Sequence, residues 1–420
     1  MQVFKFGGAS VKDAAAIKNL AEIVRQYQED ELLIVVSAMG KMTNALEQLT
    51  TAYINQTAEV QTIFAGIRAY HDQILTELFD PSHPIFDEVE NTFVEIEWMI
   101  EEEPHDDPNF IYDQIVSIGE LVSSRIVTAY LNQTGIKSKW LDVRGYIQTD
   151  NTYREGLVDW QKTSESIKES IPSFLQKEKV VTQGFIGGTS ENFTTTLGRE
   201  GSDYTAAIFA SCLNAASVTI WKDVAGVFNA DPKRFQNIIK FDQLSYPEAV
   251  EMAYYGASII HPKTIQPLQN AGIPLFVKPF LTPQDNGTVI LGEELPVKVP
   301  VIIVKTNQVL VSVSSKNHSF ITENHLSEIY KILAELHFKV NLMQNSALSF
   351  SFCVDFESGK FEQLMQKLKQ DFNFKYNTGT DLITVRHYEI SLLRELSAGK
   401  TILLEQLSRN TAQILIKAEN

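Results

Sequence analysis

Residues 5–8 place a lysine and two glycines at the end of an apolar segment. Lys5 lies in the predicted buried strand 2–6, and Gly7 and Gly8 open the turn that follows. Glycines let phosphate oxygens approach backbone N–H groups, and the start of the next helix adds positive potential. Many α/β turns need glycine only for its backbone freedom. A lysine in a buried strand is costly without an anionic partner, so the segment predicts a phosphate site.

A polar loop at 194–203 (TTTLGREGSD) leads into an apolar helix and carries further binding groups. Arg199 can hold a carboxylate through two parallel hydrogen bonds, and Gly201 and Ser202 can offer backbone N–H groups. Asp203 lies at the predicted start of the helix. Ser202 or Asp203 could instead serve only as a helix cap, although capping and ligand binding are compatible.

Glu120 interrupts the otherwise apolar helical segment SIGELVSSR (117–125). A carboxylate without a partner is costly in such a setting, so Glu120 needs a cation. The candidates are Arg125 and the ammonium group of a substrate.

The segment 219–235 (TIWKDVAGVFNADPKRF) carries two more candidates. Asp223 follows a predicted strand, and Asp231 precedes a proline. Ligands bind at the strand ends of open α/β sheets, but Asp-Pro is also an ordinary turn signal.

Two other patterns are set aside. AGKT (398–401) resembles the end of a P-loop, but Arg394 stands where the earlier glycine is required, and no strand leads directly into it. His261 lies beside Pro262 at a predicted helix start, and the other histidines lack metal-ligand spacing. We interpret His261 as structural and predict no protein metal site.

Alternating strands and helices must position these residues. Ser10, with Asp13 three residues on, is predicted to cap the first helix. An acidic helical insertion is expected between residues 50 and 112. The predicted strands are 2–6, 32–37, 138–143, 179–184, 217–221 and 274–278, and the later helical patterns are 114–131, 203–213, 246–255 and 263–270.

The pattern breaks into Gly, Pro and charged residues at 286–300, which predicts a boundary between domains 1–298 and 299–420. The tail reads as a βαββαβ unit at about 309–380. The segments at about 299–308 and 381–420 are predicted to complete a second such module. The predicted elements of the tail are strand 309–314, helix 324–337, strands 339–344 and 347–355, helix 361–371, strand 373–377, strand 382–387, an amphipathic stretch 389–408 and strand 411–417.

Composition narrows the class of protein. A chain of 420 residues with 44% hydrophobic residues is expected to form two domains. Its 52 acidic and 36 basic residues give a net charge of −16, which disfavours nucleic acid and anionic membranes as partners. The chain contains no apolar run of about 18 residues and no basic leader, so a cytoplasmic protein is expected. Cys212 and Cys353 lie in apolar settings and are interpreted as buried thiols.

Seven segments occur in the order that is typical of aspartokinases, and the chain resembles that family over residues 1–290. The segments are KFGGAS, VVSAMGKMTN, SIGELVSS, VTQGFIGG, LGREGSDYTAA, WKDVAGVFNADPKRF and GASIIHPKTI. The resemblance implies the amino-acid-kinase fold, an α/β architecture with an open, mostly parallel sheet between helices. It also implies a tail of paired ACT-like regulatory domains.

The resemblance assigns roles residue by residue. Lys5 and Asp203 match the catalytic positions. The residues matching the aspartate site are Ser37, Thr43, Glu120, Arg199, Gly201 and Ser202, with Arg199 on the α-carboxylate and Glu120 on the ammonium group. The residues matching the nucleotide site are Gly7, Gly8, Lys222, Asp223, Phe228, Asp231 and Lys233.

Three positions depart from the family pattern. Ala9 stands in place of Thr, Glu200 in place of Gly, and Ser258 in place of a nucleotide-contacting Lys. If Glu200 points outward, Gly201 and Ser202 still offer their N–H groups. Lys263 and Lys233 are the candidates to replace the missing lysine.

The resemblance implies transfer of the γ-phosphate of ATP to the β-carboxylate of L-aspartate, with Mg²⁺. The nucleophile is already ionised at neutral pH, since its reference pKa is about 3.9, so no general base is needed. The tail is expected to bind lysine or threonine and to pair between subunits of a homodimer or larger homo-oligomer. Two alternatives stay open: a related amino-acid kinase with another substrate, and an amino-acid-sensing homologue with impaired catalysis.

Overall fold

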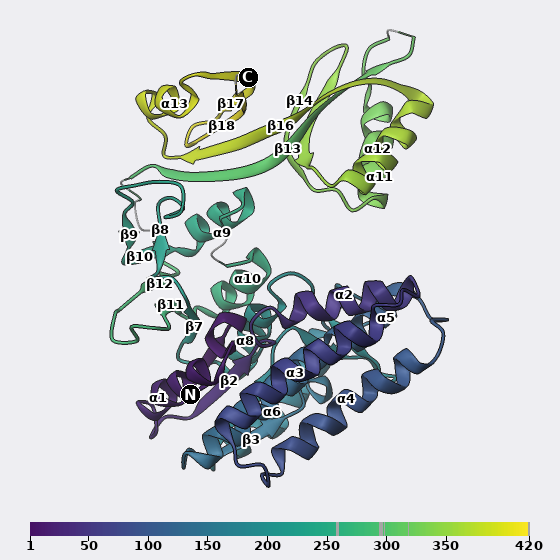
Figure 1. The fold of residues 1–420 in the computed structure, drawn as a ribbon. Helices are drawn as coiled ribbons and strands as arrows, with labels where there is room; N and C mark the ends of the chain where they lie inside the picture. The colour runs from purple at the N-terminus through teal and green to yellow at the C-terminus, as the bar shows by residue number, and fades with distance from the viewer. Residues whose placement is uncertain (258–259, 294–296, 298, 318, 419–420) are drawn as a thin grey trace. The chain divides into compact units, whose positions relative to one another are not determined.

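The computed structural model describes residues 1–420 except 258–259, 294–296, 298, 318 and 419–420. The chain forms two compact units (Figure 1). The first contains Met1–Val227, Lys240–Val250 and Ser258–Leu295, and the second contains Phe228–Ile239, Glu251–Ala257 and Pro296–Asn420. The predicted boundary at 298 falls on a residue outside the described set.

An eight-stranded sheet forms the centre of the first unit, in the order β10-β12-β11-β7-β1-β2-β4-β3. All neighbouring strands are parallel except β11 and β12. This confirms the predicted α/β class with a mostly parallel sheet. The strands are β1 (Gln2–Phe6), β2 (Leu32–Val36), β3 (Ser138–Leu141), β4 (Lys179–Gln183), β7 (Val218–Lys222), β10 (Gln243–Ser245), β11 (Leu275–Pro279) and β12 (Thr288–Leu291).

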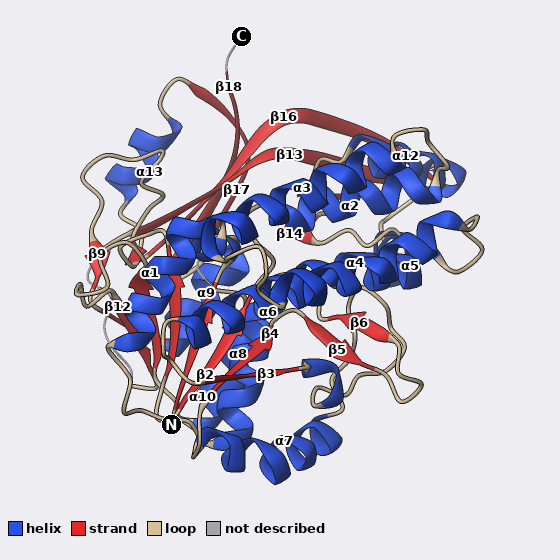
Figure 2. Ribbon diagram, turned by 60° about the horizontal axis from the view of Figure 1, so that its bottom comes forward, coloured by secondary structure: helices blue, strands red, loops and turns tan. Residues whose placement is uncertain are grey.

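Helices lie on both faces of this sheet, as Figure 2 shows. On one face, α6 (Ile118–Gln133) packs on β2, β3 and β4, and α1 (Ala14–Arg25) packs against α6. On the other face, α8 (Gly201–Leu213) packs on β1, β2 and β7, with α7 (Trp160–Leu175) and α10 (Pro262–Ala271) against it. The central strands β1 and β2 are therefore covered on both sides, which explains their nearly continuous apolar sequences.

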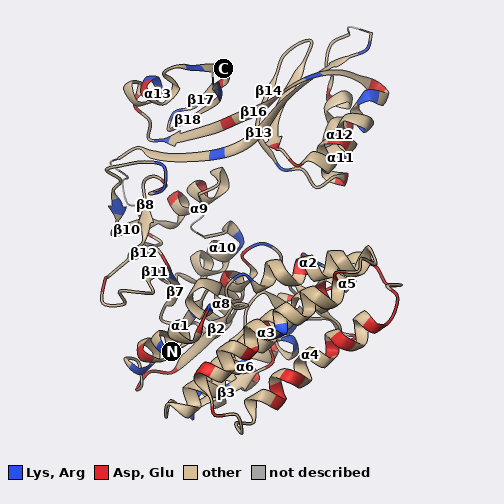
Figure 3. Cartoon of the chain, viewed as in Figure 1, with Lys and Arg blue, Asp and Glu red and all other residues tan. Residues whose placement is uncertain are grey.

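The helical insertion predicted from residues 50–112 is present. It consists of α3 (Val60–Leu78), α4 (Ile85–Glu101) and α5 (Pro108–Val116), and α2 (Met42–Ile54) packs against α3 and α5. Acidic residues are frequent along α4, as the red segments of Figure 3 show. Within the described residues, no helix combines the length and apolar character needed to cross a membrane.

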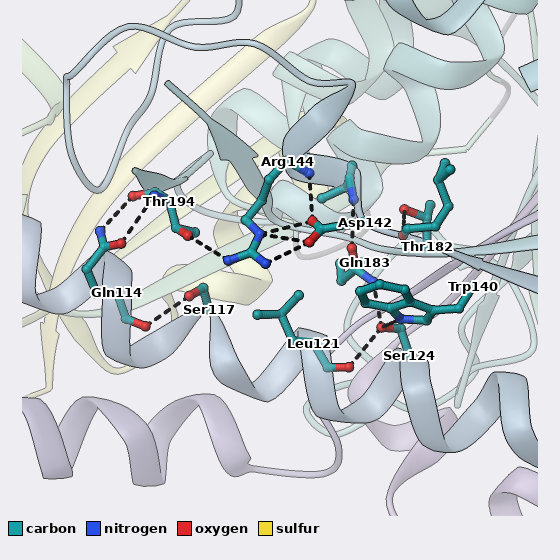
Figure 4. Close-up of polar contacts among 12 residues, drawn as sticks. Gln114, Ser117, Leu121, Ser124, Trp140, Asp142, Arg144, Thr182, Gln183 and Thr194 are labelled. Carbon is teal, nitrogen blue, oxygen red and sulfur yellow. Dashed lines mark hydrogen bonds and ion pairs between the residues drawn. The ribbon is translucent and has the colours of Figure 1, made fainter. Parts of the chain in front are cut away.

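A polar network fastens α6 to the sheet (Figure 4). The hydroxyl of Ser124 accepts hydrogen bonds from Gln183 Nε2 at 2.7 Å and from Trp140 Nε1 at 2.9 Å. Gln183 Oε1 in turn accepts from the backbone N–H of Val143 at 2.8 Å. Because buried polar groups that are fully paired favour one arrangement, these bonds fix the position of α6 and of the residues it carries.

Short elements connect the larger ones. They include the 3-10 helices η1 (Gly8–Val11) and η2 (Val143–Gly145) and the strand pair β5 (Ile186–Gly188) and β6 (Thr194–Thr196). β8 (Val227–Phe228) pairs with β9 (Lys240–Phe241), and α9 (Tyr246–Tyr255) follows β10.

The second unit contains an antiparallel sheet of six strands, in the order β14-β15-β13-β16-β18-β17. The βαββαβ order predicted for 309–380 is present. Its elements are β13 (Val301–Ser315), α11 (Glu323–Glu335), β14 (Val340–Asn345), β15 (Phe350–Asp355), α12 (Ser358–Asp371) and β16 (Phe372–Arg386), followed by α13 (Ile390–Ser397), β17 (Lys400–Leu407) and β18 (Thr411–Ala418).

The two long strands β13 and β16 differ from the prediction. The segment at about 299–308 and the strand 309–314 were expected to belong to different modules but form one strand, which pairs with β16 from Val301 to Ser315. The register shifts between Lys305 and Gln308 and between Gln308 and Leu310. Such irregularities bend a strand without ending it, so two short apolar patterns merge into one strand.

Two local predictions need correction. Ser10 does not cap α1, because it lies in η1 and its hydroxyl donates to the carbonyl of Trp221 at 3.3 Å. The cap is Asp13, which accepts from the N–H of Ala16 at 2.7 Å. The amphipathic stretch 389–408 is not one element, because Gly399 at φ +67° separates α13 from β17. AGKT (398–401) thus follows a helix and leads into a strand, so it is no P-loop.

Candidate active site

A cavity of about 650 Å³ lies in the first unit, where the carboxyl ends of β1, β2 and β7 meet the start of α8. Ligands bind at this edge in open α/β sheets. The predicted site residues that line it are Lys5, Gly8, Ser37, Thr43, Glu120, Arg199, Gly201, Ser202, Asp203 and Lys222.

Two lysines and a buried aspartate form an ion-pair cluster in this cavity. Lys5 Nζ lies 2.6 Å from Asp203 Oδ1, and Lys222 Nζ lies 3.8 Å from Asp203 Oδ2. Asp203 is 2% exposed and Lys5 8%. Burial on its own raises the pKa of Asp203, but the two ammonium groups outweigh it, and the pKa is lowered. The cluster keeps two positive charges at one wall of the cavity.

Glu120 is a buried carboxylate in a different electrostatic setting. Its Oε1 accepts a hydrogen bond from the N–H of Ala38 at 3.1 Å, whereas Oε2 has no hydrogen-bond partner among the described residues. Burial raises the pKa of Glu120 to about 8, although the bond from Ala38 and the charge of Lys5 oppose the shift. Glu120 is therefore poised to receive a cationic ligand.

Arg125 is not the partner of Glu120. Its guanidinium carbon lies 3.9 Å from the ring centre of Trp140, and Nη1 lies 3.7 Å from Glu88 Oε2. Of the two cations that the sequence allowed, the ammonium group of a substrate remains.

Glycines bring the walls of the cavity close together. A Cβ on Gly8 would lie 2.8 Å from the Gly40 carbonyl oxygen and 2.9 Å from that of Ala38. A Cβ on Gly119 would lie 2.9 Å from the Ala38 side chain. Gly7 does not line the cavity, but a Cβ there would lie 3.4 Å from Lys5 Nζ. Larger residues at these positions would push apart the segments that carry Lys5 and Glu120.

The start of α8 differs from the capping interpretation. The helix begins at Gly201 and its N-cap is Glu200, which makes no side-chain cap. Ser202 and Asp203 lie inside the first turn, so neither is the cap. A Cβ on Gly201 would lie 2.8 Å from the Phe185 ring.

Glu200 does not point away from the site. It lines the cavity, and its Oε2 is buried with no hydrogen-bond partner in the described part of the chain. Its backbone is left-handed, with φ 52° and ψ 29°. This region favours glycine, which the resemblance places at this position.

The predicted nucleotide residues are only partly assembled. Lys222 lines the cavity, whereas Asp223 is exposed and does not. Phe228, Asp231 and Lys233 belong to the second unit, where Asp231 accepts a hydrogen bond from the N–H of Lys233 at 2.9 Å. Ser258 lies outside the described residues. His261 caps α10, accepting from the N–H of Lys263 at 3.2 Å, in agreement with a structural histidine.

Other residues of the cavity were not predicted. Glu47, Tyr112, Arg154, Glu155 and Phe185 also line it. Tyr112 and Arg154 lie in the segments PNFIYD and NTYREG, which match no motif that points to a ligand. Phe185 lies in VTQGFIGG, one of the segments that carried the resemblance, but an apolar side chain gave no chemical signal there.

Comparison with known proteins identifies the class. Residues 1–279 match the model of the amino acid kinase family. The lysine-sensitive aspartokinase 3 of Escherichia coli strain K12 is 33% identical over 84% of this chain and 78% of its own length. The chloroplastic aspartokinase 1 of Arabidopsis thaliana is 31% identical over 84% of this chain, which spans 63% of that protein.

Solved structures agree with both the family and the fold. E. coli aspartokinase III in complex with aspartate and ADP (R-state) superposes with a TM-score of 0.86 at 28% identity, covering 99% of this chain and 96% of that one. The same enzyme with lysine and aspartate (T-state) gives a TM-score of 0.82 with the same coverage. The chain belongs to the amino acid kinase family, and within it to the aspartokinases. The resemblance drawn from the sequence motifs is thereby confirmed.

Proposed function

We propose that this chain transfers the γ-phosphate of ATP to the β-carboxylate of L-aspartate, giving 4-phospho-L-aspartate. One observation carries the proposal. The cavity combines the buried carboxylate of Glu120, one oxygen of which has no hydrogen-bond partner in the described ranges, with a pair of lysines held by Asp203. A zwitterionic amino acid and a polyanionic nucleotide need these opposite charges in one site. The solved relative that binds aspartate and ADP supports this substrate pair.

The chemistry is one of positioning and charge neutralisation. The β-carboxylate of aspartate is ionised at neutral pH and attacks phosphorus directly, while ADP leaves. Lys5 and Lys222 reduce the repulsion between this anion and the phosphates. Asp203 orients both ammonium groups by holding them in its own ion pairs. The start of α8, including the backbone N–H of Ser202, adds positive potential toward the phosphates. The N–H of Gly201, which the sequence also offered, donates instead to the carbonyl of Gly198 at 3.0 Å.

The amino acid is oriented by the other half of the cavity. Glu120 Oε2 receives the α-ammonium group, and Arg199, which is exposed at the cavity wall, binds the α-carboxylate. Ser37 and Thr43 offer hydroxyl groups from the same wall. Glutamate would place its side-chain carboxylate one methylene further from the groups that hold its α-carbon substituents. The site therefore distinguishes aspartate from glutamate.

Mg²⁺ is the ion we assign to the nucleotide. The described residues contain no cluster of three or more His, Cys, Asp or Glu side chains that could hold a metal alone. We propose that the ion is bound mainly by the phosphates of the nucleotide. When bound, it supplies further neutralisation of the phosphate charge.

We also infer that the second unit binds an amino-acid effector, lysine or threonine, and pairs between subunits. The solved relative in complex with lysine supports effector binding. The nucleotide roles of Gly7, Asp223, Phe228, Asp231 and Lys233 are part of the same proposal.

A substrate panel tests the function. ADP release is measured with ATP and Mg²⁺ in the presence of aspartate, glutamate or N-acetylglutamate, each with and without lysine or threonine. We expect turnover with aspartate only. Turnover with another acceptor would replace the substrate assignment, and aspartate binding without ADP release would identify a sensing homologue.

A further inference from the structure

Arg154 is a cavity residue to which the family resemblance gives no role. It lies at the tip of the loop between η2 and α7, and its side chain lines the cavity. Its backbone φ is +69°, in the left-handed region. A non-glycine residue in this region is strained and persists only where its surroundings fix it. The fixed conformation therefore prompts the question of what Arg154 does.

The loop is fastened to the body of the unit on both sides of Arg154. Asp113 Oδ2 accepts the N–H of Arg154 at 2.9 Å, and the N–H of Gly156 donates to the carbonyl of Thr196 at 2.8 Å. Asp113 is fully buried and also accepts from Thr196 Oγ1 at 2.7 Å. These bonds hold the backbone of Arg154 in its strained conformation.

The side chain of Arg154 is held as well. Its guanidinium carbon lies 4.0 Å from the ring centre of Tyr112. The hydroxyl of Tyr112 donates to Glu47 Oε1 at 2.6 Å, which fixes the ring. A guanidinium stacked on an aromatic face keeps N–H groups at its edge for an anion.

The segments that carry Arg154 and Arg199 touch each other. A Cβ on Gly198 would lie 3.4 Å from the carbonyl oxygen of Arg154 and 3.3 Å from Glu155 Cγ. Gly198 has φ +77° and directly precedes Arg199. The two arginines therefore approach the cavity from adjoining parts of its wall.

Arg154 and Arg199 are available to bind an anionic group of a ligand. Lys5 and Lys222 are engaged by Asp203. In the part of the chain that the structure describes, neither Arg154 nor Arg199 has a carboxylate oxygen within 4.0 Å of its guanidinium nitrogens. Aspartate brings two carboxylates, of which the β-carboxylate must face the phosphates. The α-carboxylate is the anion left for the arginines.

We propose that Arg154 is a substrate-binding residue that shares the α-carboxylate of the amino acid with Arg199. The inference rests on the proposed function, because it assumes an amino acid with a free α-carboxylate. It extends the carboxylate site beyond the arginine that the motif supplies. Arg154 thereby contributes to the choice of amino acid rather than to phosphoryl transfer.

The test compares ligands with and without the α-carboxylate. Binding of aspartate and of β-alanine, which keeps the ammonium group and the reacting carboxylate, is measured by calorimetry for the wild type and for Arg154→Gln. We expect aspartate to bind about 10- to 100-fold more weakly to the variant, in line with the loss of a charged hydrogen bond. The affinity for β-alanine and the KM for ATP should be unchanged. Equal weakening of both ligands, or unaltered aspartate binding, would overturn the proposal.

A second variant separates binding from folding. Arg154→Gly removes the side chain at a φ that glycine adopts without strain, so its Tm should equal or exceed that of the wild type while aspartate binding is weakened as in Arg154→Gln. A lower Tm with normal binding would mean that Arg154 serves the fold. Arg25→Gln, on the surface of the same unit, is the matched control and should bind aspartate normally.

A double-mutant cycle with Arg199→Gln gives an independent measure. If both arginines hold one carboxylate, their effects on aspartate affinity should be non-additive. Additive effects would mean separate sites and would contradict the shared contact. The outcomes for the two proposals stay distinguishable. If the wild type binds aspartate without phosphorylating it, only the proposed function is contradicted. If the wild type is active and Arg154→Gln binds aspartate normally, only this inference is contradicted.

Discussion

Two carboxylates of the cavity are equally buried yet have opposite pKa shifts. Asp203 has two ammonium groups beside it and a lowered pKa, whereas Glu120 has a raised pKa and one oxygen with no hydrogen-bond partner among the residues that the structure describes. Burial alone would raise the pKa of both. The difference shows which carboxylate is satisfied within the protein and which one awaits a ligand.

We expect Lys5→Ala and Arg199→Ala to affect different kinetic constants. Removing the Lys5 charge should lower kcat about 100-fold or more, because the charge opposes repulsion in the transition state. Arg199→Ala should instead raise the KM for aspartate about tenfold or more and change kcat less, since it removes a contact to a non-reacting group. Steady-state kinetics with varied aspartate and ATP measures both. A Lys5 variant with near-normal kcat would contradict its role.

Aspartate affinity should depend on pH through Glu120. With a pKa of about 8 in the free protein, the carboxyl group is neutral at lower pH and must lose its proton to pair with an ammonium group. We expect the KM for aspartate to fall roughly 25-fold as pH rises from 6.5 to 8.5, since with a pKa of about 8 the ionised fraction of Glu120 rises from about 3% to about 76% over that interval. Glu120→Gln should bind weakly and lose this pH dependence. A wild-type KM that is flat over this range would count against the ion pair.

At the scale of elements, the start of α8 carries both strain and an unfavourable charge. Glu200 occupies a left-handed position and places an anion beside the N–H groups that we assign to phosphate. We expect Glu200→Gly to raise affinity for ATP about threefold or more. The substitution removes a negative charge near the phosphates, and the repulsion between the two costs a fraction of a kcal/mol or more. KM for ATP measures the effect, and Glu200→Gln, which removes only the charge, is the control. A weaker affinity for ATP in both variants would show that Glu200 assists binding.

The sequence predicted helices, strands and motifs better than it predicted contacts between side chains that are far apart in the chain. Lys5 and Glu120 were recognised because a charged residue in an apolar segment stands out, and Asp203 because it ends a polar loop that matches a family motif. Arg154 and Tyr112 were missed because they reach the cavity only through the bonds of Asp113 and the stacking of two side chains. The continuous strand β13 was missed for a related reason, since its pairing with β16 overrides a local break in the apolar pattern.

At the scale of the whole molecule, His71 makes the free energy of unfolding depend on pH. It lies fully buried in α3, where Nδ1 bonds to the carbonyl of Ile67 at 2.8 Å, and Nε2 has no partner among the described residues. Burial lowers its pKa from 6.5 to about 4. As pH falls, His71 is therefore protonated in the unfolded chain before it is protonated in the folded protein. Its contribution to the free energy of unfolding is fully present above about pH 6.5 and is lost as pH falls toward 4, by at most about 3 kcal/mol.

Denaturant unfolding of the wild type and of His71→Phe between pH 7 and pH 4.5 tests this linkage. We expect the variant to lose less stability than the wild type over that interval, because one proton-uptake site is removed. Carboxylates titrate in both proteins, so the difference between the two curves isolates the histidine. Parallel curves would mean that His71 is not the group responsible.

The pairing of β13 with β16 has a mechanical consequence for the second unit. These two strands lie at the centre of the six-stranded sheet, with β14 and β15 on one side and β17 and β18 on the other. Neither half of the sheet can be cut away without severing a strand of the other, so we expect the two halves to unfold together. If the proposed effector binds one half, we expect it also to slow hydrogen exchange in the amides of the other.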